Sequence, residues 1–400
     1  MKILVLNCGS SSVKYQLIDT KDNSAIAKGM VSKIGMPGAL LTLKVPDKDT
    51  VKRSGEILDH IVAINNILNI LTHKEFGVLK DINEISGVGH RVVHGGEFFS
   101  DSVLIDNVVL KKIRDCIDYA PLHNPHNMKG INACMQVLPD IPMVAVFDTA
   151  FHQDMPDYSY FYGIPHVLYT RYGIRRYGFH GTSHFFVSKR AAELMNKDIG
   201  KINIITCHLG NGCSIAAIEK GKSIDTSMGF TPLEGLLMGT RSGDLDPAVV
   251  LQVMAREELS AAEATTMLNK HSGLIGISGV SSDMQDIEKK MVEGRSRAEL
   301  AFNVFCYRLK KYIGSYIAAL GGTDVIVFTG GIGENSTKVR AKTLEGLEFM
   351  GIELNNTVNE KTMAVEKDIS SDKSKVKTFV IPTNEELVIA IDTAKLINGK

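Results

Sequence analysis

The segment from Asn7 to Lys14 carries residue types that bind phosphate. It reads Asn-Cys-Gly-Ser-Ser-Ser-Val-Lys and lies between two apolar stretches within residues 3–20. Gly9 lets the backbone turn tightly, while the three serines and the backbone N–H groups can donate hydrogen bonds to phosphate oxygens and Lys14 adds a positive charge. An ordinary serine-rich hairpin turn is the alternative. The pattern predicts a phosphate-binding turn on a β-hairpin.

A second segment of the same design follows at residues 202–218. It reads Ile-Asn-Ile-Ile-Thr-Cys-His-Leu-Gly-Asn-Gly-Cys-Ser-Ile-Ala-Ala-Ile, which again gives an apolar strand, a glycine-rich polar turn and an apolar strand. Two such hairpins, each opening one half of the chain, predict a duplicated pair of domains that close on a polyphosphate from both sides. Chance similarity of two turns is the alternative.

The composition limits the class of protein. Four hundred residues exceed what a single core usually serves, which favours two domains. The 45 basic residues balance the 45 acidic ones, so no net charge attracts nucleic acid or an anionic membrane. The cysteines show no C-x-x-C spacing, and the chain shows neither a signal-peptide core nor an apolar run of the roughly 18 residues that span a bilayer. We expect a cytoplasmic protein with reduced thiols that binds neither nucleic acid nor membrane.

Strand and helix patterns alternate along the chain. We expect helices over 56–71, from Asn124, over 297–320 and over 385–397, and strands over 85–93, 143–147 and 324–328. The irregular, aromatic stretch 148–177 suits a domain junction, and a glycine-rich loop covers 225–246. This alternation predicts an α/β fold whose last helix could return to the first domain.

Two arginines stand among glycines, Arg91 in Gly-His-Arg-Val-Val-His-Gly-Gly and Arg241 in Met-Gly-Thr-Arg-Ser-Gly. Structural arginines usually lie on helix faces near carboxylates, whereas these lie where the backbone bends. A guanidinium can donate two parallel hydrogen bonds to a carboxylate or to a transferring phosphoryl group. Either arginine could instead be structural.

Asp148 and His180 are further candidates. Asp148 ends an apolar strand, a position typical of metal or catalytic carboxylates, although it could instead cap the next helix. His180 precedes Gly-Thr-Ser, a cluster of small donors, although an isolated histidine is more often a core residue. His123, His126 and His208 are weaker cases, and no zinc site is predicted from the histidines.

Two further segments could contact a nucleotide or metal. The Gly330–Ser336 loop follows a strand, but Ser336 replaces the third glycine of a dinucleotide fingerprint, and no P-loop motif occurs in the chain. A turn that admits the sugar or phosphates of a nucleotide is the better interpretation. Glu385 and Glu386 lie at a predicted helix start, where the helix dipole alone favours acidic residues, but Mg²⁺ also commonly binds one or two carboxylates.

Taken together, these motifs closely resemble those of the acetate kinases over essentially the full chain. The matching segments are Asn7–Lys14, Gly89–Gly96, Val146–His152, Gly178–His184, His208–Gly212, Met238–Gly243, Gly330–Asn335 and Pro382–Glu386. The resemblance implies two ribonuclease-H-like (actin-like ATPase) domains with a central cleft. It implies an N-terminal acyl kinase domain, 1–150 plus 386–400, and a C-terminal nucleotide-binding domain, 151–385. It also implies reversible phosphoryl transfer from ATP to acetate, giving acetyl phosphate and ADP, with Mg²⁺ or Mn²⁺, in a homodimer.

The resemblance also implies roles for individual residues. Asn7 and Glu385 would help hold the metal. Arg91 would bind the acetyl substrate, and Val93, Leu122, Phe179 and Pro232 would surround its methyl group. His180 and Arg241 would stabilise the transferring phosphoryl group, and Asp148 would be the catalytic acid. The nucleotide would be lined by Ser10, Ser12, Lys14, His208, Leu209, Gly210, Asn211, Gly212, Asp283, Met284, Gln285, Gly331, Ile332, Gly333, Glu334 and Asn335. Gln285 stands where relatives often carry arginine, which places that contact in doubt.

Physical chemistry favours a different role for Asp148. A carboxylic acid substrate with a pKa of about 4 is already ionised at neutral pH and needs no general base. Asp148 would then position the metal or the phosphoryl group. A kinase that prefers propionate or butyrate, or an ATP-binding switch protein without catalytic activity, are the competing functions.

Overall fold

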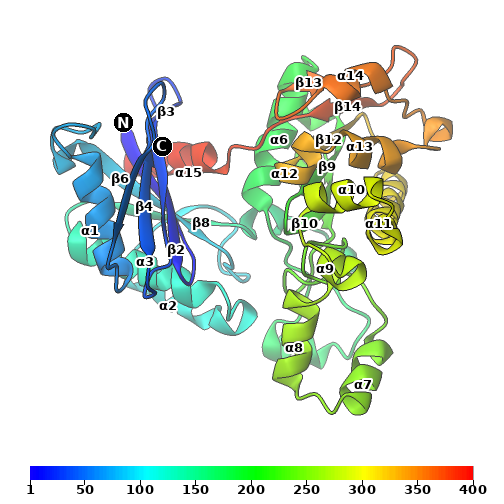
Figure 1. Ribbon diagram of the computed structural model, residues 1–400, viewed down its shortest axis with the longest axis horizontal. Helices are drawn as coiled ribbons and strands as arrows, with labels where there is room; N and C mark the ends of the chain where they lie inside the picture. Colours follow the sequence, from blue (N-terminus) through cyan, green and yellow to red (C-terminus); the bar gives the residue numbers. More distant parts are fainter. Residues whose placement is uncertain (400) are drawn as a thin grey trace. The chain divides into compact units, whose positions relative to one another are not determined.

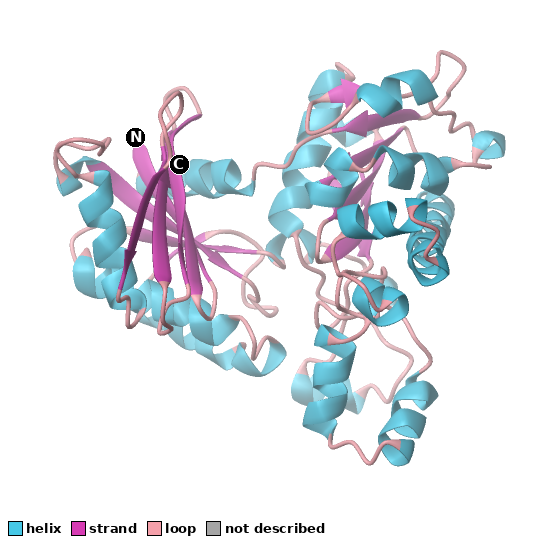
Figure 2. Cartoon of the chain, viewed as in Figure 1, coloured by secondary structure: helices cyan, strands magenta, loops and turns pink. Residues whose placement is uncertain are grey.

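The computed structural model describes residues 1–399 of the chain. They form two compact units, and each is described by itself. Unit 1 comprises Met1–Gln153 and the residues from Asn384 onward, and unit 2 comprises Asp154–Thr383. Each unit holds one β-sheet flanked by helices (Figure 2). The assignment of the acyl substrate to a domain ending at 150 and the nucleotide to 151–385 stays a prediction.

Unit 1 is built on an eight-stranded sheet. Its strands are β1 (Lys2–Cys8), β2 (Ser12–Asp19), β3 (Ser24–Ser32), β4 (Ala39–Lys44), β5 (Val51–Gly55), β6 (Ile85–Val92), β7 (Val103–Leu104) and β8 (Met143–Phe147). Its helices are α1 (His60–Leu71), α2 (Asn107–Asp115), α3 (Asn124–Val137) and α15 (Glu385–Ile397), with 3₁₀ turns at Ile82–Glu84, Ile117–Tyr119 and Ala150–His152. The strand order is β5-β4-β3-β2-β1-β6-β8-β7, in which β1, β6 and β8 run parallel.

Helix α15 returns to pack on β6, as expected, and lies beside the first strands in Figure 1. Glycines make this close approach possible, since a Cβ atom on Gly89 would lie 2.5 Å from both Ile389 Cγ2 and Thr393 Oγ1. Residues 382–386 lead directly into this helix. The packing therefore brings the first turn of α15 to the end of β6 that carries Arg91.

Unit 2 is built on a six-stranded sheet with the order β11-β10-β9-β12-β14-β13. Its strands are β9 (Asn203–Leu209), β10 (Cys213–Glu219), β11 (Lys222–Thr226), β12 (Val325–Thr329), β13 (Lys367–Asp368) and β14 (Lys377–Val380). Its helices are α4 (Asp157–Tyr160), α5 (Val167–Tyr172), α6 (Gly181–Leu194), α7 (Pro247–Arg256), α8 (Ala261–Lys270), α9 (Gly273–Ser278), α10 (Met284–Val292), α11 (Ser296–Leu320), α12 (Gly330–Asn335), α13 (Thr337–Leu344) and α14 (Asn356–Lys361), with 3₁₀ turns at Ile199–Lys201 and Glu348–Met350.

The two sheets share one topology. In each, an antiparallel hairpin is followed across the sheet by two parallel strands and a short antiparallel edge strand: β2-β1-β6-β8-β7 in unit 1 and β10-β9-β12-β14-β13 in unit 2. The two hairpins that the sequence singles out occupy the same place in this order. The predicted α/β class and the duplicated design are confirmed.

The expected elements agree with the observed ones to within a few residues. The largest difference is at α1, which begins at His60 rather than at residue 56 because Asp59 caps it, accepting a hydrogen bond from Val62 N at 2.9 Å. All six cysteines are buried, free thiols. Among residues 1–399, no helix combines the length and apolar character needed to cross a bilayer.

One buried group of unit 1 makes stability depend on pH. His90 on β6 is buried, its Nε2 atom has no hydrogen-bond partner among residues 1–399, and burial lowers its pKa to about 3. In the unfolded chain the pKa is about 6.5. Between these values only the unfolded chain binds the proton, so stability present above pH 6.5 is lost as the pH falls. We expect this loss to reach about 2 kcal/mol between pH 7 and pH 5.

Urea denaturation of a His90→Leu variant measures this contribution. The fall in free energy of unfolding between pH 7 and pH 5 should be smaller in this variant by about 2 kcal/mol. His271→Leu, at an exposed histidine, is the matched control. An unchanged pH dependence in His90→Leu would contradict the assignment.

Candidate active site

Unit 1 gathers four predicted site residues around a pocket of about 230 Å³. Asn7 and Lys14 lie directly opposite each other in the β1–β2 pair. Arg91 comes from β6, and Glu385 begins α15. These four residues contribute two cationic side chains, a carboxylate and an amide to the pocket, and Gln16, Lys28 and Glu386 also line it.

Arg91 is held by two carboxylates. Its Nε and Nη2 atoms donate to the two carboxylate oxygens of Asp148 at 2.8 and 2.7 Å, and its Nη1 atom lies 3.4 Å from Glu385 Oε2. Burial acts to lower the pKa of Arg91, but the charges of Asp148 and Glu385 outweigh it and raise the pKa above its usual range. Asp148 is only 2 % exposed. The arginine fork is therefore engaged by Asp148, and Nη1 is the guanidinium nitrogen directed away from that carboxylate.

Glu385 has both a structural and a functional explanation. It lies in the first turn of α15, which Asn384 caps by accepting from Leu387 N at 3.1 Å, and acidic residues are favoured there. Burial raises its pKa, while Arg91 opposes the shift. A carboxylate and the Asn7 amide oxygen in one pocket suit a hard cation. Within residues 1–399 no group of three or more His, Cys, Asp or Glu side chains is arranged to hold a metal, so such a cation would take its other ligands from water or phosphate.

Two buried asparagines on α3 hold the backbone beside Arg91. Asn127 accepts a hydrogen bond from Val93 N at 3.1 Å and donates to Cys8 O at 3.0 Å, which connects the ends of β6 and β1. Asn124 exchanges hydrogen bonds with the His94 backbone. Sequence reasoning missed both residues, although two asparagines three positions apart at a helix start are a usable signal.

In unit 2, His180 and Arg241 converge on Gly212. A Cβ atom at Gly212 would lie 3.3 Å from Arg241 Nη1 and 3.7 Å from His180 Nε2. His180 has a left-handed backbone, with φ 57°, immediately before α6. Its ring stacks on His208 with centroids 4.2 Å apart. The two residues that are predicted to stabilise the phosphoryl group are therefore neighbours.

Arg241 is a partly buried cation without an ion pair to a carboxylate among residues 1–399. It donates to Pro232 O at 3.1 Å, and burial lowers its pKa. The loop that carries it is braced by other charges, since Arg176 donates to Glu234 at 2.6 Å and Tyr312 donates to Asp244 at 2.7 Å. These contacts fix the loop, while the Arg241 guanidinium itself contacts the Pro232 carbonyl oxygen and no carboxylate among residues 1–399.

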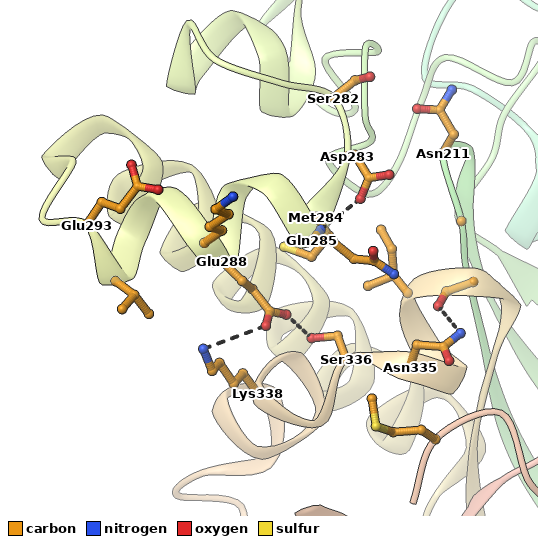
Figure 3. Close-up of a pocket in the computed structure, with 16 residues that line it drawn as sticks. Asn211, Ser282, Asp283, Met284, Gln285, Glu288, Glu293, Asn335, Ser336 and Lys338 are labelled. Carbon is orange, nitrogen blue, oxygen red and sulfur yellow. Dashed lines mark hydrogen bonds and ion pairs between the residues drawn. The ribbon is translucent and has the colours of Figure 1, made fainter.

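A larger pocket of unit 2, of about 1040 Å³, contains about half of the predicted nucleotide residues (Figure 3). Those that line it are Gly210, Asn211, Asp283, Met284, Gln285, Gly331, Ile332 and Asn335. In Figure 3, Gln285 comes from α10 and Asn335 from α12, the helices on either side of the pocket. The remaining predicted residues of this unit, His208, Leu209, Gly212, Gly333 and Glu334, do not line the pocket.

Several of these residues have a clear structural duty. Asp283 caps α10 by accepting from Gln285 N at 2.8 Å. Glu334 accepts from Gly330 N at 2.9 Å and from Thr383 N at 3.3 Å, which fixes the turn before α12. Gln285 lines the pocket, so a contact to a ligand remains available there despite the departure from arginine.

Three residues at or near this pocket were not predicted as site residues from the sequence: Glu288, Lys338 and Arg340. Glu288 on α10 accepts from Ser336 and lies 3.8 Å from Lys338 Nζ (Figure 3). Positions 285, 288, 289 and 292 share one helix face, a spacing that could have indicated a pocket wall. Arg340 is fully buried and donates to the carbonyl oxygens of Gly333 and Glu334, at 2.8 and 3.1 Å, so it holds the end of α12 from behind.

The other predicted residues are divided between the units. Val93 and the exposed Leu122 belong to unit 1, whereas the buried Phe179 and the partly buried Pro232 belong to unit 2, so neither unit alone holds all the residues of the predicted methyl pocket. Ser10 and Ser12 lie in the turn of unit 1, which is closed by a hydrogen bond from Gly9 N to Ser12 O at 2.8 Å.

Comparisons with known proteins identify the family of this chain. The model of the Acetokinase family matches residues 2–391. An acetate kinase of Thermoanaerobacter pseudethanolicus is 58% identical over 400 residues, which is 100% of both chains. The crystal structure of Porphyromonas gingivalis acetate kinase matches with a TM-score of 0.96 at 50% identity over 99% of each chain. A propionate kinase from Francisella tularensis matches with a TM-score of 0.93 at 43% identity over 98% of this chain and 99% of that one. The chain belongs to the acetokinase family.

Proposed function

We propose that the protein catalyses reversible, direct in-line transfer of the terminal phosphoryl group of ATP to acetate, giving acetyl phosphate and ADP. The observation that carries this proposal is the pairing of Arg241 with His180 around Gly212. In-line transfer spreads negative charge over the equatorial oxygens of the phosphoryl group, and catalysis depends on positioned positive charge and hydrogen-bond donors. A guanidinium without a carboxylate partner meets that need.

The main pocket proposed for each substrate lies in one unit, and residues of the other unit are assigned to that substrate as well. The 1040 Å³ pocket takes the nucleotide, with its phosphates toward Gly210–Gly212. Lys14, Ser10 and Ser12 would add donors to the phosphates. The 230 Å³ pocket is of a size for a small acid beside Arg91. Direct transfer requires both substrates to be bound at once.

The acid is proposed to bind through the Nη1 atom of Arg91, with its methyl group against Val93, Leu122, Phe179 and Pro232. Its carboxylate is ionised at neutral pH and attacks without a general base. Asp148 therefore acts on Arg91 rather than on a proton, since its two hydrogen bonds fix the guanidinium plane.

A divalent cation, Mg²⁺ or Mn²⁺, fits the oxygen ligands of Asn7 and Glu385. When bound with ATP, such a cation neutralises charge on the phosphate oxygens. Lys14 and Arg91 line the same pocket and contribute fixed positive charge there. Removal of divalent cations with a chelator should abolish turnover.

We further propose that two copies of the chain associate and that the protein is cytoplasmic. Helix α7 reads Pro-Ala-Val-Val-Leu-Gln-Val-Met-Ala-Arg, yet none of its residues is buried, with Val249 51 % and Leu251 69 % exposed. Exposed apolar residues on a helix suit contact with a second copy. Six free thiols suit a reducing compartment. A monomeric mass in light scattering would contradict the dimer.

Acyl phosphate formation, trapped with hydroxylamine, tests the reaction. We expect Mg²⁺- and ATP-dependent acyl hydroxamate from acetate, with less from propionate and butyrate. Because one methylene changes specificity by only about 1–3 kcal/mol, the three acids must be compared side by side. Preference for a longer acid would change the substrate but keep the mechanism. Absence of hydroxamate from all three acids would overturn the proposed function.

A further inference from the structure

A chain of three hydrogen bonds runs from His180 into the core of unit 2. His180 Nδ1 lies 2.9 Å from Ser214 Oγ. Ser214 Oγ lies 2.7 Å from His184 Nε2, and His184 Nδ1 lies 2.7 Å from Thr206 Oγ1. Ser214, His184 and Thr206 are fully buried. Because these three side chains are fully buried, we assign none of them a contact with a substrate.

The number of available protons decides which atom donates in each of these three hydrogen bonds. The buried Thr206 hydroxyl has His184 Nδ1 as its hydrogen-bond partner among residues 1–399, so its proton is satisfied only by donation to that atom. Neutral His184 then carries its proton on Nε2 and donates to Ser214 Oγ. The single Ser214 proton is left to donate to His180 Nδ1.

The opposite direction leaves a buried donor unsatisfied. If His180 Nδ1 donated to Ser214, then Ser214 would donate to His184 Nε2, and His184 Nδ1 would donate to Thr206. The Thr206 hydroxyl proton would have no acceptor in a fully buried position, which is the costly outcome for a hydrogen-bond network.

We propose that Thr206, His184 and Ser214 are positioning residues that keep His180 neutral with its proton on Nε2, directed toward the phosphoryl group. This inference rests on the proposed function. The Nε2 atom lies on the side of Gly212 where Arg241 Nη1 also lies. Stacking of His180 on His208, with centroids 4.2 Å apart, further disfavours two adjacent imidazolium charges. His180 thus acts as a hydrogen-bond donor that needs no protonation step.

The tautomer can be read directly by ¹⁵N NMR of histidine-labelled protein at a pH where histidines are neutral and with no substrate present. The His180 resonance is assigned by its absence from a His180→Gln variant. We expect the native protein to show Nε2 protonated and Nδ1 bare. A protonated Nδ1, alone or together with Nε2, would overturn the proposal.

Two substitutions at Thr206 separate the hydroxyl proton from the shape of the side chain. Thr206→Val keeps the volume and removes the donor, whereas Thr206→Ser keeps the donor. In Thr206→Val the His180 signal should shift toward the Nδ1-protonated form, and kcat should fall about tenfold with unchanged KM, because the lost interaction forms only in the transition state. Thr206→Ser should restore both the tautomer and kcat. An unchanged His180 tautomer in Thr206→Val would contradict the relay.

The NMR spectrum tests the tautomer of His180, and the acyl phosphate assay tests the proposed function, so either result can be negative without the other. If no acid yields an acyl phosphate, the proposed function falls while the tautomer assignment still stands or falls on the spectrum. If acetyl phosphate forms but Nδ1 carries the proton, the relay falls and the proposed reaction remains. Should Thr206→Val fail to fold, Ser214→Ala provides the same comparison from the next link, with Nδ1 of His180 losing its donor.

Discussion

Replacement of Arg241 by alanine is expected to lower kcat for acetyl phosphate formation by about 10²–10³-fold. Arg241 places a fork of donors beside His180 without a carboxylate partner of its own among residues 1–399, so its charge is available to the phosphoryl group. The interaction strengthens as charge develops on the phosphoryl oxygens. The loss should therefore appear in kcat more than in the KM values for ATP or acetate.

Two further variants make this test specific. Arg241→Lys keeps the charge but loses the two parallel donors, so we expect an intermediate kcat. Arg295→Ala makes the same deletion at an exposed arginine of unit 2 and should leave kcat unchanged. Unchanged turnover in Arg241→Ala would remove this residue from the mechanism.

Replacement of Asp148 by asparagine should lower kcat/KM for acetate by at least about 10²-fold and reduce the free energy of unfolding by about 3 kcal/mol. Asparagine retains one acceptor oxygen, so one of the two hydrogen bonds from Arg91 is lost and a partly buried cation is left with Glu385 as its remaining carboxylate. The guanidinium plane is then free to rotate. Kinetics at saturating Mg²⁺ and urea denaturation measure the two effects.

The control for Asp148 is Asp140→Asn, the same chemical change at an exposed residue of unit 1, for which we expect no effect on either quantity. A double-mutant cycle with Arg91→Ala adds a second check. Since both residues act as one unit, the double variant should be little worse than Arg91→Ala alone. Near-full activity of Asp148→Asn would refute both a catalytic and a positioning role.

Local patterns predicted much of the fold. The hairpins of residues 3–20 and 202–218, the helix ending at Gly321 and the strand ending before Asp148 all follow from apolar periodicity and from capping or glycine signals close in sequence. The predicted start of α1 was wrong by four residues because Asp59, as the N-cap, makes His60 the first residue of the helix. The end of a helix can depend on a single capping residue, whereas the presence of a helix or strand depends on a pattern of many residues.

The site could be predicted only in part, because its decisive contacts join distant residues. Arg91 and Asp148 were each singled out from local sequence, but the bidentate pair between them spans 57 positions and follows from the β6–β8 pairing. Arg340 was not singled out from the sequence, yet it is fully buried and donates to the carbonyl oxygen of Gly333 in α12. Neither the pairing of side chains across a sheet nor the burial of a charged side chain can be predicted from the residues adjacent in sequence.

The burial of every cysteine has a practical consequence for the chemistry of the protein. Burial raises the pKa of Cys8 and of Cys213 to about 12, although Cys213 directly follows Gly212 at the candidate site. The reactive thiolate fraction at neutral pH is then on the order of 10⁻⁵. Alkylating reagents and mild oxidants should reach these sulfurs only when the protein opens, so loss of activity upon treatment with them would report on unfolding rather than on catalysis.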